Sequence, residues 1–309
     1  KSNLDKISST RPIIIIHRSF HEFILNTPAM ELLGVKKNAF PSIGEDSHLA
    51  NFDDGHFSER GAILILPNLM SVLAAPKKLI QGLQQTKDYL YSNGITVIGN
   101  PGSMYNKNLQ AAKNHAFGSP DTQFESYFFP SALNLSEQFN FDQILDAAKE
   151  QTSWGAGKLN FLTKHIKLFT DGAMYSQNMV MRDGYLDNHQ GSWLMKLETF
   201  ENLFKIFWDD GYQIHIHQNG DAALDRLLLT LEKNLADNPR VDHRTTVVHF
   251  GYSAKDQLEQ MKKLGVVVSA NPYYVTALSD LYSRKGVGYE RSQEMVRLGD
   301  LIKEGIKVA

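Results

Sequence analysis

The stretch FENLFKIFWDDGYQIHIH, residues 200–217, decides the fold because it joins an amphipathic helix to a strand through a single glycine. Its first apolar residues follow the i, i+3, i+4, i+7 spacing that gathers side chains on one helical face: Phe200, Leu203, Phe204 and Phe207. Gly211 can end this helix, and residues 212–217 then have the pattern of a strand.

The same unit of helix, glycine and short β-branched strand occurs elsewhere, and it predicts strands at residues 95–98, 266–269 and 306–309. Further strands are expected at residues 12–16, 123–129, 165–169 and 245–249. Helices that alternate with strands in this way are typical of parallel strands joined by crossover helices. The sequence therefore predicts an α/β fold.

Polar side chains favour a barrel over an open sheet. They fall at the C-terminal ends of the expected strands: His17, Ser19, His21, Asn100, Lys167, Asp171, His215, His217, Asp221, His249 and Asn271. In a (β/α)8 TIM barrel all these ends open onto one face, where active sites are built. An open dinucleotide-binding sheet has little support, because no G-x-G-x-x-G motif follows a strand. We predict a single barrel domain over residues 1–309, with an irregular excursion or lid at residues 37–76.

Composition narrows the class of partner. The chain has 32 basic and 34 acidic residues without a run of like charges, so we expect a small-molecule substrate, no nucleic acid and no membrane. Cysteine is absent, so any metal must be held by histidine, carboxylate or an unusual ligand. The apolar run from Ile13 to Ile16 is too short for a signal segment or a membrane span. The cellular compartment stays open, with the cytoplasm as the default.

Three histidines are candidate ligands. Strand alternation puts His215 and His217 on one face, and His249 ends the next expected strand. Neighbouring barrel strands would bring His217 and His249 together at the mouth, where they could share one zinc ion. The alternative is that these histidines are hydrogen-bonded core residues.

Lys167 and Asp171 form a second candidate group, because they share one face of the strand at residues 165–169. A lysine that points into a barrel is costly unless it is paired or chemically altered. The alternative is a lysine on the outer face that reaches solvent. His17-Arg-Ser19-Phe-His21 with Asn26 could supply substrate hydrogen bonds or could equally be a capped turn. Asp187-Asn-His189 has the composition of a loop, and taken alone it predicts solvated surface.

Together these segments resemble the amidohydrolase superfamily, and most closely its amidohydrolase-3 branch, which includes N-substituted formamide deformylase-like proteins. The resemblance spans essentially the whole chain. It is carried by short motifs in a specific order: His17-x-Ser19-x-His21 with Asn26, Gly94-Ile-Thr96 with Asn100-Pro-Gly102, Lys167-x-x-x-Asp171-Gly172, His217-x-Asn-Gly-Asp221, and His249.

The resemblance implies a zinc-type hydrolase with one or two divalent ions, acting on an amide, formamide or cyclic amide. It makes Lys167, His217 and His249 the metal ligands, and Lys167 matches a lysine that is often carboxylated in this superfamily. Substrate contacts would come from the other candidates: Ser19, His21, Asn26, Asp171, Asp187, His189 and His215.

Two family features have no counterpart in this sequence. The first-strand His-x-His pair is absent, and the strand-eight aspartate that handles the proton would lie beyond Ala309. We therefore expect an incomplete barrel without the accessory β-sandwich, a fragment that is inactive by itself. Exposed sheet edges would invite a homodimer.

Two other functions stay open at this point. A non-catalytic barrel could serve as a binding or regulatory module, and a metal-free enzyme could use Lys167 as a Schiff base. The metal content of the protein would distinguish the hydrolase from both alternatives, because only the hydrolase needs a bound ion.

Overall fold

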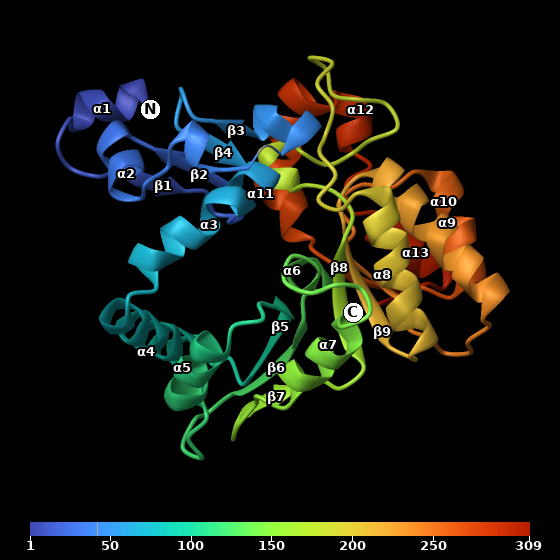
Figure 1. Ribbon diagram of the computed structural model, residues 1–309. Coiled ribbons are helices and arrows are strands. Elements are labelled where there is room, and N and C mark those ends of the chain that lie inside the picture. Colours follow the sequence, from blue (N-terminus) through green and yellow to red (C-terminus); the bar gives the residue numbers. More distant parts are fainter. Residues whose placement is uncertain (42) are drawn as a thin grey trace.

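The computed structural model describes residues 1–41 and 43–309 and contains three sheets. One is antiparallel, with strands in the order β1-β2-β4-β3, and the other two are parallel, in the orders β5-β6-β7 and β12-β11-β10-β9-β8. Figure 1 shows the antiparallel sheet at one end of an arc of chain and the five-stranded parallel sheet at the other. The α/β class is confirmed.

The antiparallel sheet belongs to an N-terminal lobe, defined as residues 1–41 and 43–73. Its strands are β1 Ile14–Ile16, β2 Glu22–Leu25, β3 Ala50–Asn51 and β4 His56–Ser58. Its helices are α1 Ser2–Ile7, α2 Thr27–Leu32, η1 Lys37–Ala39, η2 Gly44–Leu49 and α3 Arg60–Leu73. The lobe has a hydrophobic cluster of its own, built around Phe23, Leu25, Phe57 and Ile65.

Two predictions about this lobe were wrong. The strand predicted at residues 12–16 pairs antiparallel with β2 instead of joining the parallel strands. The short turn at residues 17–21 explains this, because it links antiparallel strands, whereas parallel strands need a long crossover. The predicted irregular excursion at residues 37–76 contains β3, β4 and α3, while Ser42 lies outside the described residues.

Seven of the eight described strands of the α/β part overlap predicted positions, and the exception, β7, was not predicted. They are β5 Val97–Ser103, β6 Glu125–Pro130, β7 Leu159–Phe161, β8 His165–Phe169, β9 Gln213–Gln218, β10 Thr246–His249, β11 Val267–Ala270 and β12 Lys307–Val308. A parallel bridge from Ser131 to Lys167 connects the end of β6 to β8. The two parallel sheets are therefore continuous with one another, as neighbouring strands are in a TIM barrel. Closure with eight strands stays a prediction.

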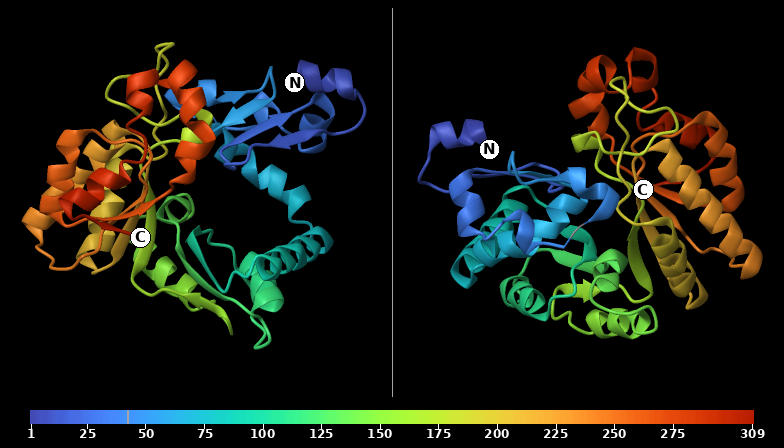
Figure 2. Two further views of the ribbon diagram at one scale, coloured as in Figure 1. Left: turned by 180° about the vertical axis from the view of Figure 1, so that it is seen from behind. Right: turned by 45° about the horizontal axis from the view of Figure 1, so that its top comes forward.

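Helices cover the outer side of the strands in Figure 1 and in both views of Figure 2. They are α4 Pro76–Ser92, α5 Lys107–Phe117, α7 Ile144–Thr152, α8 Leu197–Asp209, α9 Asp221–Asp237, α10 Lys255–Leu264 and α13 Leu298–Glu304. Three others lie at the C-terminal ends of the strands (Figure 1): α6 Ala132–Ser136, α11 Tyr273–Leu281 and α12 Tyr289–Ser292. Two short turns complete the set, η3 Met174–Ser176 and the π-helix η4 Tyr282–Gly286.

Helix α8 packs against the core as the spacing of its apolar residues predicts. The four apolar residues of its inner face are all fully buried: Phe200, Leu203, Phe204 and Phe207. Gly211 has a φ of +76° just after the helix, a conformation that costs glycine little. This packing fixes α8 against β8 and β9, the two strands that carry Lys167 and His217.

Among the described residues no single helix is long and apolar enough to cross a membrane. One pair, α3 and α4, passes that test only when taken together, and it is bent by 93°.

Candidate active site

Lys167, His217 and His249 lie on three neighbouring parallel strands, β8, β9 and β10. In the register of the sheet, His217 stands beside Phe169 on one side and beside Val248 on the other. The rings of His217 and His249 meet edge to face, with centroids 4.6 Å apart. Strand pairing therefore brings together the three residues predicted as metal ligands.

The backbone at His249 is strained. His249 has a φ of +77° and the next residue, Phe250, a φ of +51°, a region that residues other than glycine rarely occupy. Such conformations cost roughly 1–3 kcal/mol each and often occur at functional sites. The strain turns the chain directly at the end of β10, beside His217.

Burial makes the charged forms of these side chains unfavourable. Lys167 is 3% exposed, and burial lowers its pKa to about 7. Burial, with a smaller contribution from Lys167, lowers the pKa of His249 to about 3, and burial lowers the pKa of His217 well below its usual range. Near neutral pH both imidazoles are therefore uncharged, the form that binds metals.

The amine of Lys167 has no hydrogen-bond partner among the described residues, although its nitrogen is buried. The ring of Phe169 lies beneath it, with the nitrogen 5.4 Å from the ring centroid. An unsatisfied buried amine is costly, and carboxylation would convert it to an anionic group with two oxygens that can bind metal. This orphaned nitrogen is the feature of the site that fits a metal.

Two observations bear on how well the three residues would hold an ion. The described part of the chain contains no group of three or more His, Cys, Asp or Glu side chains arranged to hold a metal. The amide nitrogen of Asn219 also lies 2.8 Å from Nε2 of His217, so this imidazole nitrogen is already engaged. The donor set therefore fits a metal only if Lys167 contributes and Asn219 turns aside.

Asp171 is fully buried and organises the end of β8. Its carboxylate accepts hydrogen bonds from the backbone N–H groups of Val180, Asn219 and Gly220 and from the hydroxyl of Thr170. Burial raises the pKa of Asp171 to about 7, although these hydrogen bonds act in the opposite direction. The four donors occupy its acceptor positions, so the structure uses Asp171 to fasten the loop after β8 to the end of β9.

The N-terminal lobe brings His21 to the same place. Its ring centroid lies 5.6 Å from that of His217, and Nδ1 of His21 lies 2.7 Å from a carboxylate oxygen of Glu59. The sequence analysis missed Glu59, because no motif or periodicity marked it. Only the antiparallel pairing of β2 with β4 makes the two residues neighbours.

Ser19 and Asn26 are scaffold residues of the lobe. The hydroxyl of Ser19 lies 2.9 Å from Nδ1 of His17 and accepts from the backbone N–H of His21. Asn26 caps α2, and its amide group makes four hydrogen bonds, to the backbone of residues 8, 11, 13 and 29. Four hydrogen bonds use both donors and both acceptor positions of an asparagine side chain. The structure therefore does not bring Asn26 to the site.

The remaining predicted contacts lie around the three residues. Asp187 and His189 pair with each other in the loop between β8 and α8, and the His189 ring stacks on Tyr185 with centroids 4.1 Å apart. His215 lies two residues before His217 on β9 and bonds to His165 at 3.0 Å. Burial lowers the pKa of His215 to about 3. Their roles as substrate contacts stay predictions.

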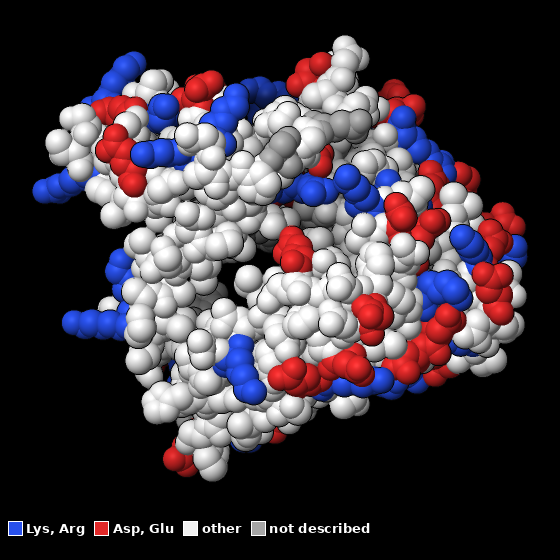
Figure 3. Space-filling view, viewed as in Figure 1, with Lys and Arg blue, Asp and Glu red and all other residues white. Residues whose placement is uncertain are grey.

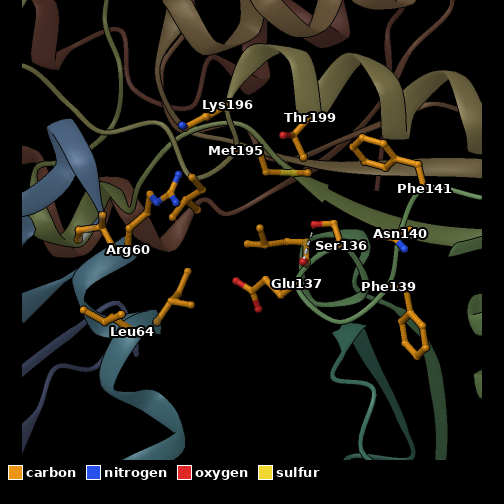
Figure 4. Close-up of a pocket in the computed structure, with 14 residues that line it drawn as sticks. Arg60, Leu64, Ser136, Glu137, Phe139, Asn140, Phe141, Met195, Lys196 and Thr199 are labelled. Atoms are coloured by element: carbon orange, nitrogen blue, oxygen red, sulfur yellow. Dashed lines mark hydrogen bonds between the residues drawn. The ribbon is translucent and has the colours of Figure 1, made fainter. Parts of the chain in front are cut away.

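A cavity of about 560 Å³ opens between the lobe and the α/β part. Figure 3 shows the surface hollowed at the centre of that view, and Figure 4 shows Arg60 and Leu64 of α3 facing Glu137 across the cavity. The described residues that line it do not include Lys167, His217 or His249. Its lining is connected to the His21 side of the site only along the chain, since Arg60 directly follows Glu59.

Comparison with known proteins places the chain in a family. A family model described as the amidohydrolase family matches residues 1–309. This chain belongs to the amidohydrolase family. The resemblance to the amidohydrolase-3 branch, stated from the motifs, is thereby confirmed.

Relatives and solved structures agree with this membership. The Bacillus subtilis protein YtcJ is 22% identical over 328 residues, which cover 100% of this chain and 56% of that protein. The Arabidopsis thaliana protein Long After Far-Red 3 is 22% identical over 302 residues, 94% of this chain and 50% of that protein. The fold resembles the crystal structure of a metal-dependent hydrolase from Pyrococcus horikoshii, with a TM-score of 0.69 at 20% identity, covering 100% of this chain and 58% of that one. The chain thus spans about half the length of the curated relatives it matches.

Proposed function

We propose that the protein that contains this chain is a zinc-type hydrolase that cleaves a non-peptide C–N bond in an amide, formamide or cyclic amide. Membership of the amidohydrolase family supports a hydrolytic reaction. The activity is proposed for the whole protein, since the chain spans 50% and 56% of two relatives.

One observation carries this proposal. Lys167 is buried without a hydrogen-bond partner for its amine, next to the buried His217 and the half-buried His249, whose pKa values are both lowered. A barrel core without a chemical role would place an apolar side chain there, because burying an unpaired amine is costly. A carboxylated Lys167 with His217 and His249 forms a mixed oxygen and nitrogen donor set that suits zinc.

The residues divide the work as follows. His217 and His249 would offer imidazole lone pairs to the ion once Asn219 turns aside, and a carboxylated Lys167 would offer carbamate oxygens. Asp171 holds the ends of β8 and β9 in place through its four hydrogen bonds. A bound divalent ion supplies Lewis acidity toward the scissile carbonyl and toward water.

The cavity between the lobe and the α/β part supports a small-molecule substrate. Its volume of about 560 Å³ lies within the range of ligand pockets, and its walls are mostly apolar with a few charged groups. Ile63, Leu64 and Phe139 would contact an aliphatic or aromatic part of the substrate. Arg60 and Lys196 lie at one side of it in Figure 4 and could meet a polar end.

A zinc titration tests the metal site directly. Purified metal-free chain is titrated with zinc by calorimetry, with and without bicarbonate, for the wild type, His217→Ala and the control His115→Ala, an exposed histidine on α5. We expect near-stoichiometric binding that strengthens with bicarbonate, at least a tenfold loss in His217→Ala and no change in the control. Equal binding by all three proteins would refute the site, and no binding by the wild type would favour the two metal-free alternatives, the binding module and the Schiff-base enzyme.

Carboxylation of Lys167 is tested separately. The chain is incubated with zinc and ¹³C-bicarbonate, and a carbamate carbon resonance is sought by NMR. The resonance should be present in the wild type and absent in Lys167→Met. A resonance that persists in the variant would assign the carbamate to another lysine.

A further inference from the structure

A paired histidine and glutamate face the candidate metal ligands from the N-terminal lobe. His21 directly precedes β2 and Glu59 directly follows β4, two strands that pair antiparallel. The backbone N–H of Glu59 donates to the carbonyl oxygen of His21 at 2.9 Å. The two side chains, called the His21–Glu59 pair below, are thus held side by side by a sheet.

Glu59 is a buried acid with both oxygens engaged. Its side chain is 0% exposed; one oxygen lies 2.7 Å from Nδ1 of His21, and the other accepts from the backbone N–H of Ala173 at 2.8 Å. Ala173 belongs to the loop that follows β8, so Glu59 ties the lobe to the strand that carries Lys167. Gly172 makes room for this carboxylate, because a Cβ there would lie 2.8 Å from it.

The backbone of Glu59 is strained. Glu59 has a φ of +45°, which is unfavourable for a residue with a side chain. A buried carboxylate in a strained conformation is retained where surrounding structure holds it, and such positions cluster at functional sites. Both the burial and the strain set Glu59 apart from the other His–Glu contact of the same sheet, His56 with Glu22, which is 44% and 20% exposed.

His21 is the reachable member of the pair. Its side chain is 24% exposed, and its ring lies beside His217. No hydrogen bond from another described residue reaches its Nε2. A carboxylate only accepts hydrogen bonds, so the ring nitrogen that faces Glu59 must carry the proton. In the neutral ring Nε2 is then an acceptor without a partner among the described residues.

We propose that His21 contacts the substrate, accepting a hydrogen bond from its N–H group at Nε2, and that Glu59 is the positioning residue that holds this ring and its tautomer. The inference rests on the proposed function, whose substrate it narrows to amides that carry an N–H. A tertiary amide or an ester would leave Nε2 without its donor, and sites built around such a bond reject molecules that lack it.

The tautomer of His21 is measured first. Long-range ¹H–¹⁵N spectra of the labelled chain at pH 9 show which ring nitrogen carries the proton, and His21→Gln assigns the resonances. A hydrogen bond to a charged acceptor predicts an excess of the Nδ1–H form of roughly tenfold or more. Glu59→Gln should bring the two forms close to equal, while the control His56→Gln changes nothing. A proton on Nε2 in the wild type would overturn the proposal.

Substrate contact is measured with two small probes, formamide and N,N-dimethylformamide, which differ in the N–H group. Formamide should shift the Nε2 resonance saturably, N,N-dimethylformamide should not, and the formamide response should be lost in Glu59→Gln. Equal shifts with both probes, or none with either, would refute the contact. Thermal unfolding of each variant, including the assignment variant His21→Gln, establishes that it is folded.

This experiment and the zinc titration fail in different ways. A formamide response without zinc binding would overturn the proposed metal site and leave the contact of His21 standing. Zinc binding with no formamide response, in either the metal-free or the zinc-loaded chain, would do the reverse.

Discussion

Replacing Lys167 with methionine should stabilise the metal-free chain, and the gain should depend on pH. Burial lowers the pKa of Lys167 from 10.5 to about 7. A difference of about 3.5 pKa units corresponds to about 5 kcal/mol, at 1.36 kcal/mol per unit. The amine of Lys167 therefore binds a proton more tightly in the unfolded chain than in the folded chain, and this difference destabilises the folded state.

The sign follows from proton linkage. Between pH 7 and 10.5 the unfolded state holds the proton and the folded state does not, so the free energy of unfolding of the wild type rises with pH. Below pH 7 both states hold the proton and the deficit is constant. Lys167→Met lacks this group, so its advantage should be largest at pH 7 and below, about 5 kcal/mol at most, and should vanish toward pH 10.5.

Urea denaturation from pH 6 to 10, in buffer free of metal and bicarbonate, measures this difference. Lys233→Met, at an exposed position of α9, is the matched control and should follow the wild type at every pH. Curves for Lys167→Met and the wild type that stay parallel over this range would refute the assignment of Lys167 as a buried, unpaired amine. Zinc with bicarbonate should stabilise the wild type and leave Lys167→Met unchanged.

Four further substitutions test the scaffold. Asp171→Asn replaces an acceptor oxygen with a donor opposite backbone N–H groups, so urea denaturation should show a loss of about 2–4 kcal/mol; an unchanged midpoint would contradict its four-bond role. Gly220→Ala should strongly reduce the yield of folded protein, because a Cβ there would lie 1.9 Å from the carbonyl oxygen of Val180, whereas Gly299→Ala, with open space around it, should be neutral or stabilising by up to about 1 kcal/mol. Burial lowers the pKa of His215 to about 3, so the unfolded state binds its proton first and stability should fall as pH drops from 6.5 toward 3. His215→Phe should flatten that part of the acid-unfolding curve followed by circular dichroism, and an equally steep curve would argue against a neutral His215.

The sequence predicted seven of the eight described parallel strands, all but β7, because local patterns decide each of them. Apolar residues at helical spacing must face a core, and glycine ends a helix where other residues would be strained, so α8 and β9 lie where residues 200–217 place them. Side chains at the ends of parallel strands share one edge, which is why Lys167, His217 and His249 could be grouped in advance. Their chemical roles stay predictions.

The error at residues 12–16 has a physical reason. Three consecutive isoleucines, Ile14 to Ile16, are compatible with a strand in either kind of sheet, and the pairing direction depends on the connection that follows. The sequence analysis took residues 12–16 as one more parallel strand and therefore expected His21 at the C-terminal end of that strand. The structure places it in a hairpin turn instead.

By itself, then, the sequence determined the α/β alternation, the family and the three residues gathered by neighbouring strands. Only the tertiary structure decided that a separate lobe docks beside them, that Glu59 fixes His21 near His217, and that Asn26 is occupied within the lobe. Periodicity reports which side of its own element a residue faces. Contact between residues 21, 59 and 217 depends on how two independently packed cores meet, and no local pattern along the chain encodes that.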